Sequence, residues 1–433
     1  MSDQIHMLPK AYHEAVEHWQ RHNFPEFPEL SKRWQQYFPK DEEFCLCARI
    51  EQGMPGEIQV GDKKGQPKAA VPSELDKEAA EQLLMIVRAQ ASTEFGSIQQ
   101  HHGTFERAND PHDQTWVLRV MAEELRHGYQ MIHLLTSADW SSVTDTKPQD
   151  MVEEILSMQT GSHVLAAFNL EYDSFGDSIV FAAFIDRVGK YQLTMQKVNA
   201  YAPMAASMPP MLREEAFHLA AGVIPMRRWM EAAASDRNAT MDVSTIQKMV
   251  AKWYGRGLEM FGDERGGQTN VKLGLKDMAN RQAQDLYIEE CTKMLDDLNI
   301  RFVRARLAHL SREQADSAYE RVKAGDTVEA VSRDDLLRLP DRRFFRRRGE
   351  PAFQLVGFDG EEFTDVEAYI AHVLKHLPEA YRASIDVKHW IEMQRKVSSG
   401  ELELKKAISS MPRLARSGGA CPCSKSVRWV MDS

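Results

Sequence analysis

The chain has 433 residues, of which 43% are hydrophobic and 27% charged, as in an ordinary soluble protein of one large domain or two to three smaller ones. A formal net charge of −10 argues against broad nucleic-acid binding, and five cysteines are too few for a disulfide scaffold. Neither a signal peptide nor a run of about 18 apolar residues is visible, so we expect a cytoplasmic protein without a membrane span.

Three regions follow one another along the chain. Residues 1–75 are expected to form an N-terminal extension, in which the near-alternating segment Phe44–Ile50 predicts a short strand. Residues 76–310 have helical periodicity and are expected to form the core, and residues 311–433 a C-terminal extension. The elements expected in this last region are a hairpin over 337–363, a helix over 366–377 and a loosely held tail.

The core is expected to contain two pairs of helices. Glycine, asparagine, aspartate and proline within 103–111 predict the break inside the first pair, and three prolines within 201–210 predict the break inside the second. The helices expected are 73–101, 112–135 and two within 151–233, followed by helices over 244–262 and 274–308.

The most specific pattern is a Glu-x-x-His pair that occurs twice, each time after a further acid at nearly the same distance. The residues are Glu94, Glu124 and His127 in the first half, and Asp186, Glu215 and His218 in the second. The interval from the leading acid to the pair is almost equal in the two halves, since 124 − 94 = 30 and 215 − 186 = 29. Because positions i and i+3 share one face of a helix, the Glu and His of each pair can reach one metal ion together.

Each acid stands where the apolar stripe of its helix calls for a core-facing residue, as Val120 and Met121 before Glu124 illustrate. A buried carboxylate costs several kcal/mol unless it is paired, so four of them require cations. Four carboxylates and two neutral imidazoles carry a charge of −4, which two ferrous ions balance. The sequence therefore predicts a carboxylate-bridged site for two iron ions inside a four-helix bundle, and with it O₂ chemistry.

Two further acids, Glu123 and Glu214, directly precede the paired glutamates. Their helix face is rotated by about 100°, so we interpret both as solvated charges, with support of the metal ligands as the alternative.

Asp186 and Glu215 are less evenly spaced about the break between their helices than Glu94 and Glu124 are about theirs. This asymmetry predicts a third helix that is not straight, or a long connection.

The ligand segments resemble the oxygenase components of the benzoyl-CoA 2,3-epoxidase family and, more distantly, the catalytic subunits of phenylacetyl-CoA ring epoxidases. The resemblance covers roughly residues 40–350. The segments that carry it are Thr93-Glu94-Phe-Gly-Ser97, Glu123-Glu124-Leu-Arg-His127-Gly, Asp186-Arg-Val-Gly-Lys-Tyr-Gln-Leu193 and Glu214-Glu215-Ala-Phe-His218.

This resemblance implies a mainly α fold, a ferritin-like four-helix bundle with added helices and small β-containing extensions. It also implies that the two groups of three residues named above bind the two sides of a di-iron centre. The substrate would be an aromatic acyl-CoA of the benzoyl-CoA or phenylacetyl-CoA type, as in aromatic catabolism. One oxygen atom of O₂ would enter the ring as an epoxide, with electrons from a separate NAD(P)H-dependent flavin and iron–sulfur reductase. We expect a monomer or homodimer.

Weaker signals suggest substrate contacts. Gly96, Ser97 and Gln100 lie near Glu94, and the family has a larger residue in place of Gly96, which leaves the acyl group open. Arg346 and Arg347 belong to a cluster of five arginines that suits the phosphates of CoA, although a solvated loop is the alternative. Two Cys-x-Cys pairs, formed by Cys45, Cys47, Cys421 and Cys423, favour idle thiols over a four-thiolate zinc site.

Other functions remain open at this point. A di-iron N-oxygenase, hydroxylase or desaturase would use the same ligands on another carrier-bound substrate. Iron storage, a radical-generating subunit or a metal-free relative are alternatives of other classes. The long segments before and after the bundle, 1–75 and 311–433, argue against storage, because storage proteins of this type are nearly pure bundles. Tyr129 follows His127 by two positions and so lies on another helix face, which argues against a radical subunit.

Overall fold

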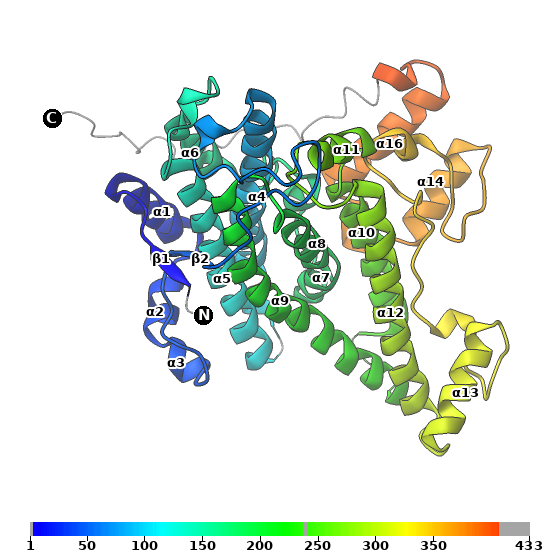
Figure 1. Cartoon of the computed structure of the whole chain (residues 1–433). Coiled ribbons are helices and arrows are strands. Elements are labelled where there is room, and N and C mark those ends of the chain that lie inside the picture. The colour runs from blue at the N-terminus through cyan, green and yellow to red at the C-terminus, as the bar shows by residue number, and fades with distance from the viewer. Residues whose placement is uncertain (1–2, 109, 237–238, 240, 407–433) are drawn as a thin grey trace.

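The computed structural model describes residues 3–108, 110–236, 239 and 241–406. Within these residues the chain is mainly α-helical, with 16 α-helices and a single two-stranded sheet (Figure 1). The predicted fold class is therefore confirmed at the level of a mainly α protein with a small β extension.

The N-terminal extension lies against one flank of the central helices, at the left of Figure 1. Strands β1 (Gln4–His6) and β2 (Ala48–Ile50) pair antiparallel, with Gln4 opposite Ile50. The strand predicted within Phe44–Ile50 is thus present over its last three residues. The helices of this extension are α1 (Lys10–Asn23), α2 (Phe27–Lys32) and α3 (Trp34–Tyr37).

Four long helical segments form the central bundle. They are α4 (Lys77–His102), α5 (Pro111–Thr136), a third segment made of α7 (Phe175–Phe181), the π-helix η5 (Ala182–Asp186) and α8 (Arg187–Gln196), and finally α9 (Ala202–Ser235). Helix α4 packs along α5, and α9 packs against both α5 and the third segment. Side-chain caps fix two of the starts, because Asp110 accepts from the N–H of His112 and Ser174 from that of Asp177.

The break predicted at residues 201–210 is wrong in position, because α9 begins at Ala202 and continues through Pro209 and Pro210. A proline inside a helix leaves the carbonyl four residues earlier without its partner. Here the backbone N–H of Glu51, next to β2, donates to the freed carbonyl of Ala206 at 2.9 Å. The N-terminal extension thus supplies the hydrogen bond that Pro210 cannot.

This correction also removes the apparent asymmetry of the second helix pair. The connection runs over 197–201, with its centre at position 199. Asp186 and Glu215 lie at similar intervals on either side of that centre, since 199 − 186 = 13 and 215 − 199 = 16. The long connection offered as one explanation is not present, because only residues 197–201 separate the two helices; the third segment instead contains a π-helical turn, which ends at Asp186.

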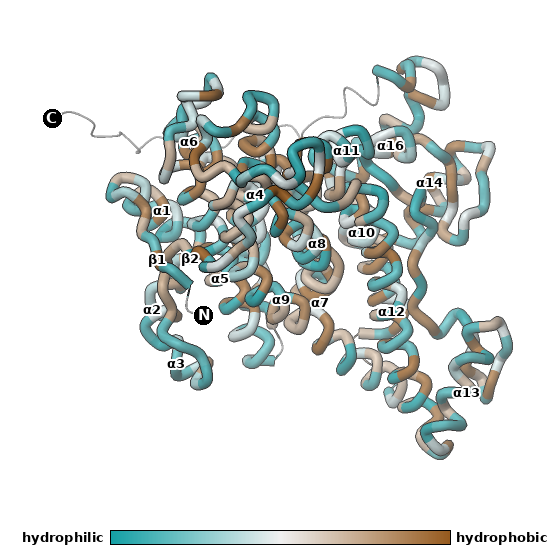
Figure 2. Tube along the Cα trace, in the orientation of Figure 1, coloured by the Kyte–Doolittle hydropathy of each residue, from teal (hydrophilic) through white to brown (hydrophobic). Residues whose placement is uncertain are grey.

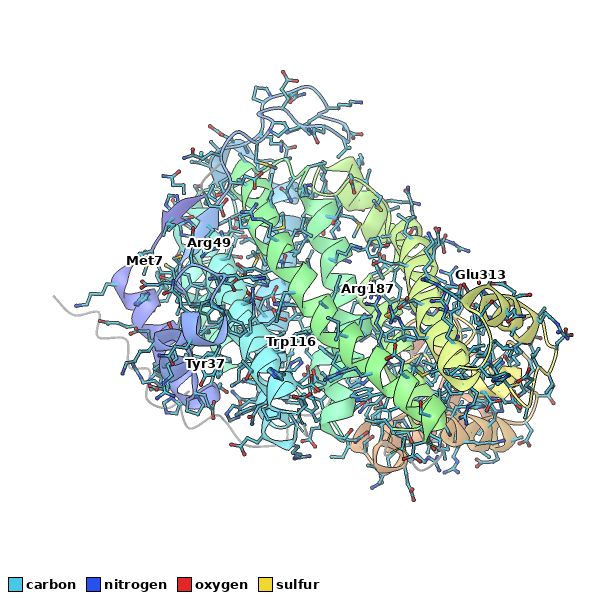
Figure 3. The ribbon with its side chains drawn as sticks, turned by 90° about the horizontal axis from the view of Figure 1, so that it is seen from below. Met7, Tyr37, Arg49, Trp116, Arg187 and Glu313 are labelled. Atoms are coloured by element: carbon cyan, nitrogen blue, oxygen red, sulfur yellow. The ribbon has the colours of Figure 1, made fainter. Side chains whose placement is uncertain are left out.

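Further helices pack around the bundle, the first of them on α4 and α5. They are α6 (Pro148–Ser157), α10 (Val243–Met260), α11 (Glu264–Lys272), α12 (Asn280–Arg306) and α13 (Arg312–Lys323). Helix α10 packs on the π-helix, and α12 runs along α9. Arg187, labelled in Figure 3, pairs with Glu290 of α12 and ties that helix to the third segment.

The hairpin expected over 337–363 does not form; the structure has only an isolated bridge between Val356 and Glu362 there. The consecutive residues Phe344 and Phe345 are both buried, at 1% exposure, whereas a half-buried strand alternates its faces. Phe345 adopts a positive φ of 43° and packs on Trp390 of α16. The helix expected next is confirmed as α14 (Val366–Lys375), followed by α15 (Glu379–Arg382) and α16 (Ile385–Ser398). The tail expected at the C-terminus, with Cys421 and Cys423, lies outside the described residues.

Buried apolar residues from most of these elements join into one continuous core. Along helices such as α9 and α12 the hydropathy alternates between hydrophilic and hydrophobic stretches, as expected for helices with one buried face (Figure 2). None of the helices that the structure describes is both long enough and apolar enough to span a lipid bilayer.

Candidate metal centre

The six residues of the repeated motif come together in the middle of the bundle. Glu94 lies on α4, Glu124 and His127 on α5, Asp186 at the end of the π-helix, and Glu215 and His218 on α9. Their exposures are 8% for Glu94, 4% for Glu124, 1% for His127, 6% for Asp186, 5% for Glu215 and 0% for His218. Four carboxylates are therefore buried side by side with two imidazoles.

The distances divide the cluster into two halves that share Glu124. In the first half, ligand atoms of Glu94, Glu124 and His127 all lie within 4.8 Å of one another. In the second, Nδ1 of His218 lies 3.6 Å from Glu215 Oε2 and 3.8 Å from Glu124 Oε1. Because Glu124 Oε2 is also 3.5 Å from Nδ1 of His127, this carboxylate occupies the position between the two halves.

Five ligand-type atoms in the cluster lack a hydrogen-bond partner among the described residues. They are Glu124 Oε2, His127 Nδ1, Asp186 Oδ2, Glu215 Oε2 and His218 Nδ1. A buried polar atom that makes no hydrogen bond costs about 1–3 kcal/mol, so such atoms are rare in native structures. Five of them in one place, all nitrogen or carboxylate oxygen, fit the coordination of metal ions such as iron.

The proton affinities of the acids reflect their crowding when no cation is present. Burial, together with the charge of Glu124, raises the pKa of Glu94 and of Asp186 well above their ordinary values, and raises that of Glu215 to about 8. Burial acts in the same direction on Glu124, but contacts with Glu94 and His127 outweigh it and hold its pKa below the usual range. The pKa values are thus pushed apart because four like charges cannot coexist here, and metal binding would release the protons.

The prediction that Glu123 and Glu214, the acids adjacent to the motif, are solvated is wrong. Glu123 is 1% exposed and accepts a hydrogen bond from Nε2 of His218 at 3.2 Å, and Glu214 accepts one from Nε2 of His127 at 3.0 Å. Each acid serves the histidine of the other helix, because the rotated face of α5 is the one that meets α9. With Nε2 donating outward, Nδ1 is left with its lone pair toward the carboxylates.

Two arginines of α5 balance these supporting acids. Arg119 Nε donates to Glu123 at 3.0 Å, and Arg126 donates to Glu214 at 2.6 Å. The guanidinium of Arg119 also lies 4.0 Å from the ring of Phe217, and that of Arg126 lies 4.3 Å from the ring of Phe44. Each histidine is therefore the inner end of a His–Glu–Arg chain that ends on an aromatic ring.

Two glycines allow the third segment and α9 to approach closely. A Cβ on Gly222 would lie 2.4 Å from the backbone nitrogen of Ala183 in the π-helix, and one on Gly189 would lie 3.2 Å from Glu215 Oε1. Only glycine therefore fits at position 222 without displacing the π-helical turn that carries Asp186.

A cavity of about 150 Å³ opens beside the acids. Glu94, Glu124, Asp186 and Glu215 line one side of it. The apolar wall is formed by Ile86, Leu165, Phe168, Ile185, Leu193 and Met260, and the polar remainder includes Gln90, Thr93, Gln192, Gln196 and Lys276. The cluster thus faces a small, largely apolar space, as a site for chemistry on a bound molecule requires.

The residues suggested as substrate contacts near Glu94 have internal roles and do not line this cavity. A Cβ on Gly96 would lie 3.1 Å from the ring of His163, so the glycine allows that ring to pack on α4. Ser97 donates to Glu124 at 3.2 Å, and Gln100 donates to the carbonyls of Ala167 and Leu170. Ser97 thus orients a ligand candidate, and Gln100 anchors the segment before the third helix.

The arginines suggested for CoA phosphates are also engaged within the protein. Arg347 is 6% exposed and pairs with Asp386 of α16 at 2.5 Å. Arg346 is half-buried, with Nε 3.5 Å from Glu259 and Nη1 donating to the carbonyl of Arg342. Arg346 connects this segment to α10 and Arg347 connects it to α16, which the sequence could not show because Glu259 and Asp386 are distant from them along the chain.

Sequence reasoning assigns Glu123 and Glu214 a role in supporting the ligands only as the less favoured alternative, and it assigns Lys276 no role. The doubled acids in Glu123-Glu124 and Glu214-Glu215 were a usable signal, since the same doubling in both halves suggests the same role. Lys276, which lines the cavity from the connection between α11 and α12, gave no comparable signal. Cys45 and Cys47 form no disulfide among the described residues, and their suggested zinc partners lie outside these residues, so their interpretation as idle thiols stays a prediction.

Comparisons with known proteins agree with this geometry. Residues 121–333 match the family model described as phenylacetic acid catabolic protein, a stretch that holds five of the six ligand candidates. The chain is also 27% identical over 220 residues to benzoyl-CoA oxygenase component B of Aromatoleum evansii, in a match covering 48% of this chain and 46% of that relative. The match spans about half of the length of that relative. Over residues 121–333 the chain is thus similar to the phenylacetic acid catabolic protein family, and over about half of its length it is similar to a benzoyl-CoA oxygenase component.

Proposed function

We propose that this protein is a di-iron oxygenase that epoxidises the aromatic ring of an acyl-CoA thioester of the benzoyl-CoA or phenylacetyl-CoA type. The observation that carries the proposal is the buried cluster of four carboxylates and two histidines, which contains five unpartnered atoms and whose carboxylates line a cavity. The name of the relative, an oxygenase component for benzoyl-CoA, supports both the reaction class and the substrate class.

The cluster offers three ligands to each of two iron ions. Glu94, Glu124 and His127 would hold one ion, and Asp186, Glu215 and His218 the other, with Glu124 between them. Iron bound here would supply the activation of O₂ by two electrons. We propose residues 76–310 as the catalytic core, since all six ligands lie within them.

The protein's own contribution is to orient the ligands and shape the space. The hydrogen bonds from His127 to Glu214 and from His218 to Glu123 fix which nitrogen of each imidazole faces the acids. The apolar wall of the cavity disfavours water beside the acids. Water would otherwise compete with substrate for the same space.

The size of the cavity suits one aromatic ring. An engineered cavity of about 150 Å³ in another protein binds benzene, and the cavity here has about the same volume. The nucleotide part of CoA is far larger and would lie outside, so that only the acyl end reaches the acids.

An oxygenase of this kind needs partners. The designation of the relative as a component implies further components in that system. We propose that the electrons come from a separate NAD(P)H-dependent flavin and iron–sulfur reductase, and that this chain acts in the cytoplasm as a monomer or homodimer.

The test is oxygen incorporation. Iron-loaded protein, reduced chemically without oxygen and then exposed to ¹⁸O₂, should add one labelled atom to benzoyl-CoA or phenylacetyl-CoA, as measured by mass spectrometry of the thioester. A His218→Ala variant should give no labelled product. Absence of label from both thioesters, in protein that contains two irons per chain, would refute the substrate class and favour an N-oxygenase, a desaturase or iron storage.

A further inference from the structure

Besides the four acids, the cavity is lined by polar residues that are not metal-ligand candidates. Gln90 comes from α4, Gln192 and Gln196 from one face of α8, and Lys276 from the connection between α11 and α12. We call these four residues the polar corner. The connection that carries Lys276 is firmly held, because the carbonyls just before it, those of Gly274 and Leu275, accept from Ala200 N and Asn199 Nδ2.

Lys276 is buried without a charge partner. The residue is 6% exposed, and its Nζ donates to Gln192 Oε1 at 2.7 Å. An ammonium group has three donors, so two remain unused, and no carboxylate pairs with it in the described part of the chain. Burial alone lowers its pKa, to about 8. No carboxylate of the metal site therefore balances the charge of Lys276.

The glutamines around it are also incompletely paired. Gln192 Nε2, Gln196 Oε1 and Gln90 Oε1 are buried and make no hydrogen bond to any described residue. Together with the free donors of Lys276, they are unmet donors and acceptors in the lining of the cavity that holds the metal-site acids. Buried polar groups in native proteins are paired, so such a group points to a polar ligand atom that meets them.

We propose that the polar corner binds the thioester carbonyl of the acyl-CoA, with Lys276 Nζ and Gln192 Nε2 donating to its oxygen. This inference rests on the proposed function and identifies which substrate group is held. The acyl ring then extends past the apolar wall toward Glu94 and Asp186, since the corner and the acids line the same cavity. The acceptors of Gln90 and Gln196 suit the amide N–H nearest the thioester in the pantetheine arm.

Placing the carbonyl at this corner gives Lys276 a positioning role. A hydrogen bond from a charged donor contributes about 1.5–3 kcal/mol, which corresponds to about 10- to 150-fold in affinity. That contribution depends on the carbonyl oxygen, so it disappears for a ligand that has a methylene group in its place. A lysine that merely fills space would affect both ligands equally.

The experiment measures equilibrium binding of benzoyl-CoA and of its thioether analogue S-benzyl-CoA by anaerobic titration calorimetry. For Lys276→Met we expect benzoyl-CoA to bind 10- to 100-fold more weakly and S-benzyl-CoA to change less than twofold. Gln192→Leu, which removes the second donor, should show the same selectivity and provides a further test where Lys276→Met does not fold. Lys272→Met, four residues earlier and exposed, is the matched control and should leave both affinities unchanged.

The possible failures are distinguishable. Equal weakening of both ligands, or no weakening of either, would overturn the assignment of the carbonyl site and leave the proposed function intact. If wild-type protein binds neither CoA ligand, the proposed substrate class is wrong, and the carbonyl site falls with it.

Discussion

The buried lysine at the cavity has a consequence for stability that needs neither iron nor substrate to be tested. The folded protein lowers the pKa of Lys276 from 10.5 to about 8, with burial as the cause. A folded pKa below the unfolded one means that the unfolded chain holds the proton more tightly. The resulting loss of stability is fully present below pH 8 and is relieved as the pH rises toward 10.5.

The magnitude follows from the two pKa values. A difference of 10.5 − 8 = 2.5 corresponds to about 3.4 kcal/mol. Nearly all of this penalty applies at pH 7, and about 1 kcal/mol remains at pH 10, so it changes by about 2.5 kcal/mol between these pH values. Lys276→Met removes the titrating group and should remove the same pH dependence.

Chemical denaturation at pH 7 and pH 10 tests this reasoning. The stability gained by Lys276→Met over wild type should be about 2.5 kcal/mol larger at pH 7 than at pH 10. Taking the difference between variant and wild type cancels the other titrating groups. Lys272→Met, whose side chain is 68% exposed, should show no such difference. A gain that is the same at both pH values would mean that Lys276 is charged and satisfied in the folded protein, and would refute the reasoning.

Three further predictions concern the supporting structure. Glu214→Gln weakens the acceptor of His127 and should lower iron affinity about 10- to 100-fold in chelator competition; an affinity within twofold of wild type would show that this hydrogen bond does not orient the ligand. Gly222→Ala should destabilise the protein by about 1–3 kcal/mol in thermal unfolding, because its Cβ meets the π-helix, whereas Gly56→Ala, which meets nothing within 4 Å, should be neutral; equal effects would contradict the close approach. Arg347→Met leaves the carboxylate of Asp386 buried and unpaired, and should lower the free energy of unfolding in urea by about 3–5 kcal/mol. The affinity for CoA thioesters should not change. A selective loss of that affinity would instead support a role of Arg347 in phosphate binding.

The sequence was sufficient for those parts of the protein that depend on periodicity. The helix boundaries in the first pair and the six ligand candidates follow from apolar stripes and from the spacing of acids within them, because a helix places i and i+3 on one face whatever surrounds it. The structure brings all six together, while their role in binding metal stays a prediction.

Features that depend on contacts between distant segments could not be predicted. Pro210 indicates a helix break until Glu51 is seen to bond the carbonyl of Ala206. The arginine cluster leaves a solvated loop and a phosphate site open until Asp386 is seen beside Arg347. In the same way, the position of Glu123 on its helix indicates a solvated charge until α9 is seen to cover it.

The most direct test of the central claim is the iron content of the purified chain, measured by elemental analysis of protein from iron-replete cells together with its absorption spectrum. Six ligands in two halves that share Glu124 predict about two irons per chain, falling to one or none in Glu124→Ala. No iron, even after anaerobic reconstitution with ferrous ion, would contradict the assignment of the metal centre and the oxygenase function built on it.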